Sequence, residues 1–69
     1  MSWTSQTFLN LAIDRLRKAH VKNPRLDGEL LLAHALNCNR TQIFMEPDRI
    51  INQNEFNRCQ HFLDRRVRR

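Results

Sequence analysis

The sequence predicts an all-α fold, a small bundle of four to five helices joined by short loops. Apolar residues recur at spacings of three and four along most of the chain, as on helices that bury one face. Capping residues precede these segments, and no run alternates between apolar and polar residues as a strand would. With 69 residues we expect one domain spanning residues 1–69, which buries about 60% of the surface of its unfolded chain.

The first helix is expected to begin at Thr4. The Thr4 side chain can cap the helix while Trp3 packs on Phe8, an arrangement known as a hydrophobic staple. A single apolar stripe then follows the helix, and it consists of Phe8, Leu9, Ala12, Ile13, Leu16 and Ala19. This helix therefore buries one face and exposes the other.

The second helix is expected to begin after Asn23, with Pro24 at its first position, and to run to about Leu36. It is apolar over more than half its circumference, so we expect it to be the most buried element, with Leu31 in the core. Gly28 inside a helix costs about 1 kcal/mol relative to alanine. Another helix that crosses closely at this position would explain it.

A third, short helix is expected between residues 40 and 46. Asn37 is a candidate left-handed C-cap of the preceding helix, and Asn39 can cap the next one with Gln42 reaching back. Ile43 and Phe44 are expected to pack inward. The predicted helix has about two turns.

The last helix is expected to run from Gln53 to the end of the chain. Pro47 ends the short helix, and a loop over residues 48–50 follows, with room for one further helical turn. Asn52 and Glu55 form the clearest capping pair in the sequence. The apolar stripe of this helix comprises Phe56, Cys59, Gln60, Leu63 and Val67, with Phe62 beside it.

The net charge of +5 is concentrated at the end of the chain. From Arg58 onward five arginines stand against the single acid Asp64, which leaves residues 1–57 at +1. Cations at a helix C-terminus complement the macrodipole, whereas a nucleic-acid-binding surface should carry its bases along one face of the fold. We favour the first explanation. A helix-turn-helix built from residues 40–45 and 52–69 stays as the alternative, although its roughly six to eight linking residues exceed the usual tight turn.

The residues that could carry chemistry stand at unremarkable spacings, so we predict no catalytic, cofactor-binding or metal-binding residue. The soft ligand candidates are His20, His34, His61, Cys38 and Cys59, and no pair has the spacing of a zinc finger. A glycine-rich cofactor turn needs more than the one glycine present. No apolar run approaches the roughly 18 residues of a membrane span. We expect a soluble, cytoplasmic monomer with both cysteines reduced.

Several segments in register resemble the N-terminal domain of the HemK/PrmC family of release-factor glutamine methyltransferases. The resemblance covers the chain from Phe8 to Arg66 and is carried by Pro24-Arg25-Leu26-Asp27, Glu29-Leu30-Leu31-Leu32-Ala33-His34, Leu36, Arg40-Thr41-Gln42, Leu63 and Arg65-Arg66. Three positions depart from the family pattern. Gly28 replaces the common alanine, Asn37 the common glycine, and Asn52 the usual serine or threonine cap.

The resemblance implies a role in binding a protein substrate. Enzymes of that family use S-adenosylmethionine to methylate the glutamine of the Gly-Gly-Gln motif in peptide-chain release factors. Their catalytic Asn-Pro-Pro-Tyr and cofactor loop lie in a Rossmann-like domain beyond this segment, and Asn23-Pro24 is here followed by Arg25 at a helix start. The expected partner is therefore a release factor, with no catalytic residue and no cofactor in this chain.

Four arginines of the last helix are the predicted partner contacts, because arginine is favoured at interfaces and can steer an acidic partner. They are Arg58, Arg65, Arg66 and Arg69. Two other functions stay open at this point: a small basic nucleic-acid-binding module and a stand-alone helical adaptor.

Overall fold

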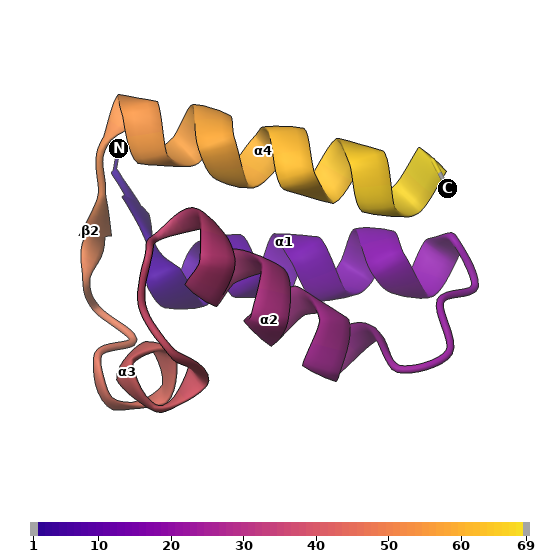
Figure 1. Cartoon of the computed structure of the whole chain (residues 1–69), viewed down its shortest axis with the longest axis horizontal. Helices are drawn as coiled ribbons and strands as arrows, with labels where there is room; N and C mark the ends of the chain where they lie inside the picture. Colours follow the sequence, from indigo (N-terminus) through magenta and orange to yellow (C-terminus); the bar gives the residue numbers. More distant parts are fainter. Residues whose placement is uncertain (1, 69) are drawn as a thin grey trace.

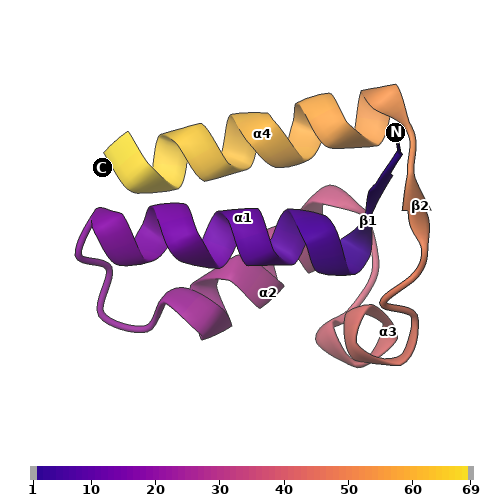
Figure 2. The same cartoon turned by 180° about the vertical axis from the view of Figure 1, so that it is seen from behind.

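The computed structural model describes residues 2–68, and over this range the chain forms a helical bundle with one very small sheet. Its elements are β1 (Trp3–Thr4), α1 (Ser5–Lys18), α2 (Pro24–Ala35), α3 (Arg40–Met45), β2 (Ile50–Ile51) and α4 (Gln53–Arg68). Figure 1 shows α1 and α4 side by side along the molecule, with α2 crossing α1. In the reverse view of Figure 2, α3 and the two strands lie at the end away from the C-terminus. The predicted all-α bundle is confirmed.

The beginning of α1 is capped as the sequence predicts, with Thr7 completing the cap. The Thr4 hydroxyl accepts a hydrogen bond from the Thr7 amide at 3.2 Å, and the Thr7 hydroxyl accepts one from the Thr4 amide at 2.8 Å. Trp3 packs edge-on against Phe8, with ring centroids 5.9 Å apart, so the hydrophobic staple is confirmed. Phe56 of α4 contacts both rings and ties this end of α1 to α4.

The segment before α4 is a strand, which the sequence did not predict. Ile51 pairs with Trp3 and Ile50 with Thr4 in an antiparallel register. The preceding loop also accepts hydrogen bonds from the first turn of α1, through the carbonyls of Pro47 and Arg49. The first amides of a helix lack partners within it, so this loop satisfies them. Two-residue strands are too short to show the alternation by which a strand is found in a sequence.

Both ends of α2 lie where the sequence predicts them, but one predicted capping hydrogen bond is not formed. Pro24 occupies the first turn, and Asn37 beyond the C-terminus has φ 58, the predicted left-handed conformation. Asn23 lies at the N-cap position, but its side chain makes no capping hydrogen bond, so that expectation was wrong. With φ −132 and ψ 77, Asn23 departs from the extended backbone that Thr4 and Asn39 adopt at their caps. His20, for which the sequence predicted no left-handed conformation, has φ 63 where the chain leaves α1.

The close crossing predicted at Gly28 is confirmed. A β-carbon at this position would lie 3.3 Å from Leu9 Cδ1 and 3.4 Å from Ile13 Cγ1, both on α1. The residue of α2 that fills the core is Leu32, which is fully buried, whereas Leu31 is only partly buried. The placement of Leu31 in the core was therefore off by one residue, because α1 covers the side of α2 that carries Gly28 and Leu32.

Helix α3 is capped by Asn39 and Gln42 as predicted, with hydrogen bonds of 2.9 and 3.1 Å in the two directions. Ile43 is buried, but Phe44 points outward and is 78% exposed, so its predicted inward packing was wrong. Successive residues of a helix are separated by about 100° around its axis, and α3 has neighbours on one side only. Phe44 falls on the part of the α3 surface that the neighbouring elements leave uncovered.

Helix α4 begins with the predicted capping pair. The Asn52 side chain accepts from the Glu55 amide at 2.8 Å, and the Glu55 carboxylate accepts from the Asn52 amide at 3.0 Å. Glu55 also binds Arg49 at 2.9 Å, so this cap is joined to the loop that precedes β2. Cys59 and Leu63 of α4 are fully buried in the shared core. Within residues 2–68 no helix is long and apolar enough to cross a membrane.

Candidate functional site

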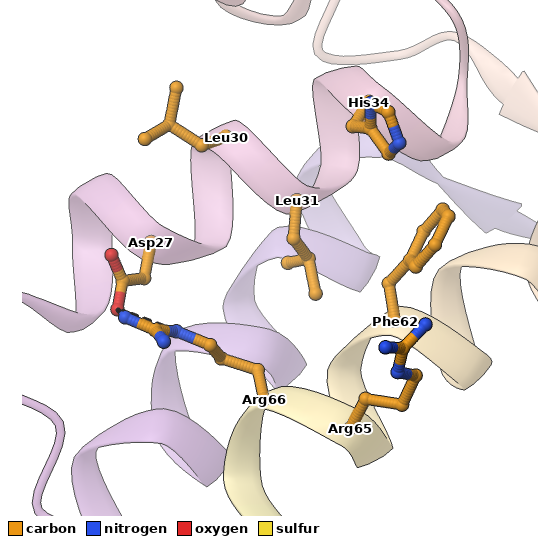
Figure 3. Close-up of a pocket in the computed structure, with 7 residues that line it drawn as sticks. All are labelled: Asp27, Leu30, Leu31, His34, Phe62, Arg65 and Arg66. Atoms are coloured by element: carbon orange, nitrogen blue, oxygen red, sulfur yellow. Dashed lines mark hydrogen bonds and ion pairs between the residues drawn. The ribbon is translucent and has the colours of Figure 1, made fainter. Parts of the chain in front are cut away.

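An open groove runs between α2 and α4, with a volume of about 510 Å³. Figure 3 shows its lining. Asp27 and Arg66 meet at one end, and His34 and Phe62 face each other at the other end with ring centroids 5.0 Å apart. Leu31 points toward the interior between the helices, while Leu30 lies on the outer edge of α2. We call this surface the α2/α4 groove; its lining is Asp27, Leu30, Leu31, His34, Phe62, Arg65 and Arg66.

Helical spacing brings these residues together. On α2, Leu30 and Leu31 lie three and four residues after Asp27, and His34 lies four and three residues after them. On α4 the step from Phe62 to Arg65 and Arg66 is again three and four. Residues at these spacings share one face of a helix, so each helix contributes one wall of the groove.

Arg66, one of the predicted contact residues, is already engaged within the chain. Two of its nitrogens donate to one carboxylate oxygen of Asp27, Nη2 at 2.7 Å and Nε at 3.1 Å. The Asp27 side chain is 18% exposed and that of Arg66 54%, so the pair lies at the surface with its acidic partner largely covered. Arg66 thus links α4 to α2, and its charge is compensated locally.

Besides Arg66, four exposed Arg and His residues form a line along one side of α4. Arg58, His61, Arg65 and Arg68 are all exposed and stand three, four and three residues apart, which places them on one face. We call these four residues the basic stripe. Within residues 2–68 none of its arginines forms an ion pair, and Arg65 belongs both to the stripe and to the groove lining.

The predicted contact arginines therefore divide into three cases. Arg58 and Arg65 lie on the basic stripe, Arg66 binds Asp27 beside it, and Arg69 lies outside the described residues. The sequence reasoning missed the apolar part of the surface, above all Leu30 and Phe62. One signal was present: a helix that is apolar over more than half its circumference cannot bury all of it in so small a bundle.

A second exposed apolar area lies on α3 and β2. Its members are Phe44, Met45 and Ile50, which are 78%, 72% and 60% exposed. We call these three residues the α3 patch. Beside it, Arg25 and Arg40 both approach Glu29, at 3.4 and 2.7 Å. The α3 patch belongs to the end of the molecule that is remote from the last turn of α4 (Figures 1 and 2).

The possible metal ligands and the two cysteines are the chemically reactive groups of the described residues. Residues 2–68 contain no group of three or more His, Cys, Asp or Glu side chains that could hold a metal ion. Cys38 and Cys59 are free, and burial, followed by the nearby Glu55 charge, raises the pKa of the Cys59 thiol from 9.0 to about 11. A thiol is nucleophilic as thiolate, so Cys59 is protonated and inert at neutral pH.

The residues in hand also do not fit a nucleotide-like cofactor such as S-adenosylmethionine. In Rossmann-like folds such groups are held by a glycine-rich turn between a strand and a helix. Gly28, the single glycine of the sequence, lies inside α2 against Leu9.

The fold and the groove define a small helical domain with an open, partly basic surface. Residues 7–69 match the family model described as the PrmC N-terminal domain. The chain therefore belongs to the PrmC N-terminal domain family. No solved structure matches the chain significantly.

Its curated relatives are longer methyltransferases. The release factor glutamine methyltransferase of Nitratidesulfovibrio vulgaris is 44% identical over 50 residues, which are 72% of this chain and 17% of that protein. The enzyme of the same name from Rhodopirellula baltica is 40% identical over 48 residues, 70% of this chain and 16% of that protein. The bifunctional methyltransferase of Rickettsia bellii is 31% identical over 68 residues, 99% of this chain and 12% of that protein. The chain thus spans about a fifth or less of the length of these relatives.

Proposed function

We propose that this chain is the substrate-recognition domain of an S-adenosylmethionine-dependent protein-glutamine methyltransferase. Its partner is a peptide-chain release factor, and the residue modified is the glutamine of the Gly-Gly-Gln motif. In this proposal the domain binds and orients the release factor, while the cofactor and the methyl transfer belong to the rest of the protein. The two free cysteines are in keeping with a reducing, cytoplasmic setting.

The observation that carries the proposal is the α2/α4 groove beside the basic stripe, on a chain whose relatives are named for methylating release factors. A glutamine side chain in a catalytic pocket offers a small contact. A specific protein complex buries about 800 Å² on each partner, so selecting one protein requires further surface. A rigid helical bundle with exposed apolar and basic groups supplies such surface.

The direct test compares two substrates of the full-length protein with and without residues 1–69. We expect the deletion to leave S-adenosylmethionine binding intact and to reduce methylation of the intact release factor strongly. Methylation of a short peptide containing Gly-Gly-Gln should change little, because the peptide is too small to reach the domain. Cofactor binding controls for the folding of the shortened enzyme. Equal methylation of the intact factor by both enzymes would contradict the proposal.

A further inference from the structure

The α2/α4 groove has an apolar part that nothing in the described chain covers. Leu30 is 49% exposed on the rim of the groove, and Leu31 and Phe62 are only partly buried behind it. Apolar surface gains free energy when it leaves water, in proportion to the area removed. An apolar side chain of a partner would bury Leu30 and complete the packing around Phe62.

Within residues 2–68, the charge near the groove that has no partner is positive. Acids close to α4 are already bound: Asp27 by Arg66, Asp64 by Arg15 at 3.0 Å, and Glu55 by Arg49 at 2.9 Å. The three arginines of the basic stripe keep their charge uncompensated within residues 2–68. Complementary charge across an interface raises the association rate and fixes orientation. The surface therefore suits carboxylates.

We propose that the α2/α4 groove and the basic stripe bind one acidic segment of the release factor, which places an aliphatic or aromatic side chain against Leu30 and Phe62. This inference rests on the proposed function and adds the chemistry of the bound segment. Arg65 contacts a carboxylate of the segment, because it belongs to both the groove and the stripe. Arg66 is a positioning residue: it holds α4 against α2 through Asp27.

The same stripe would also attract nucleic acid, but the groove favours a protein segment. Phosphate contacts are electrostatic and need no apolar partner. A nucleic acid backbone lying along the stripe would leave Leu30 in water. A protein segment with alternating acidic and apolar side chains satisfies both features at once.

The test measures binding of the 69-residue chain to purified release factor by calorimetry. Two substitutions alter the proposed surface, Leu30→Ser and Arg65→Glu. Two matched controls alter the same kinds of side chain elsewhere: Phe44→Ser in the α3 patch, and Arg17→Glu, an exposed arginine in the last turn of α1. Thermal unfolding of each variant shows that it is folded. A double-stranded RNA is titrated in parallel.

We expect Leu30→Ser and Arg65→Glu each to weaken binding about tenfold or more. This is roughly the effect of losing one apolar contact or of reversing one charge at an interface. The controls should change affinity less than about twofold, and the effect of Arg65→Glu should shrink at high salt. Amide resonances of residues 30–34 and 61–68 should shift on binding.

The contrary outcomes separate the two proposals. Tight binding that Leu30→Ser and Arg65→Glu leave unchanged, or that only Phe44→Ser weakens, would overturn the groove while release-factor recognition stands. Tighter binding to the RNA than to the release factor, abolished by Arg65→Glu, would assign the stripe to nucleic acid. Absence of binding to the release factor, together with undiminished methylation by the shortened enzyme, would overturn the proposed function as well.

Discussion

Arg66 of α4 donates two hydrogen bonds to one carboxylate oxygen of Asp27 of α2, at 2.7 Å from Nη2 and 3.1 Å from Nε. The two residues are 39 positions apart in the sequence, so the pair links two helices that no short loop joins. It also leaves the neighbouring Arg65 as the arginine of the groove that is available to a partner.

The Asp27–Arg66 pair should contribute measurably but modestly to stability. Because Arg66 is largely exposed, a double-mutant cycle of Asp27→Asn and Arg66→Gln should give a coupling free energy of at most about 1 kcal/mol. High salt should reduce it. Urea unfolding of the four proteins measures the coupling. The matched cycle of Asp27→Asn with Arg65→Gln should give none, and equal coupling in both cycles would refute the assignment of the pair.

Leu32 and Leu30 should respond very differently to truncation. Leu32 is fully buried, so Leu32→Ala should lower the free energy of unfolding by about 2 to 5 kcal/mol, enough to unfold much of so small a domain. Leu30→Ala should change it by less than about 1 kcal/mol, since half of that side chain is already in water. Chemical denaturation compares the two, with Leu31→Ala expected between them. A larger loss for Leu30→Ala would mean that α2 is rotated about its axis.

The N-cap residues of α2 and α4 should contribute differently to the free energy of unfolding. Asn52→Ala removes the hydrogen bond from the Glu55 amide and should cost about 1 kcal/mol, the usual value for an N-cap. Asn23→Ala removes no side-chain capping bond and should cost clearly less. Thermal melts of the two variants settle the comparison, and the exposed Asn54→Ala serves as a control on α4. Equal costs would show that Asn23 caps α2 after all.

Cys59 should make the protein less stable in alkali. Burial raises the pKa of this thiol to about 11 in the folded chain from 9.0, so the folded state favours the protonated form. The stabilisation is therefore fully present below pH 9 and is lost as the pH rises through 11. Urea unfolding of the native chain and of Cys59→Ala across this pH range isolates the effect of Cys59. Lysines titrate in both proteins, so their contribution cancels in the comparison. Parallel declines for the two proteins would contradict the shift.

Most local features were well predicted because their bonds span three or four residues, with the side-chain cap expected at Asn23 as the exception. The caps of Thr4, Asn39 and Asn52 each involve a side chain and an amide three positions away, so the pattern in the sequence already contains both partners. The same holds for the left-handed Asn37, which follows from local backbone preference. Gly28 also allowed one tertiary feature to be predicted, the close crossing of α1 and α2. Glycine is unfavourable inside a helix, so its presence indicates a close neighbour.

By itself, then, the sequence determined the helices, their boundaries, the approximate location of the core and the family. Only the tertiary structure showed that Phe44 and Leu30 face solvent and that Ile50 and Ile51 pair with the first strand. It also showed that, within residues 2–68, Arg66 has an acidic partner and Arg65 has none. Periodicity indicates which residues share a helix face. Which part of an apolar face stays exposed, and which charge finds a partner, depends on the neighbouring helices, whose positions are set by contacts between residues far apart in the chain.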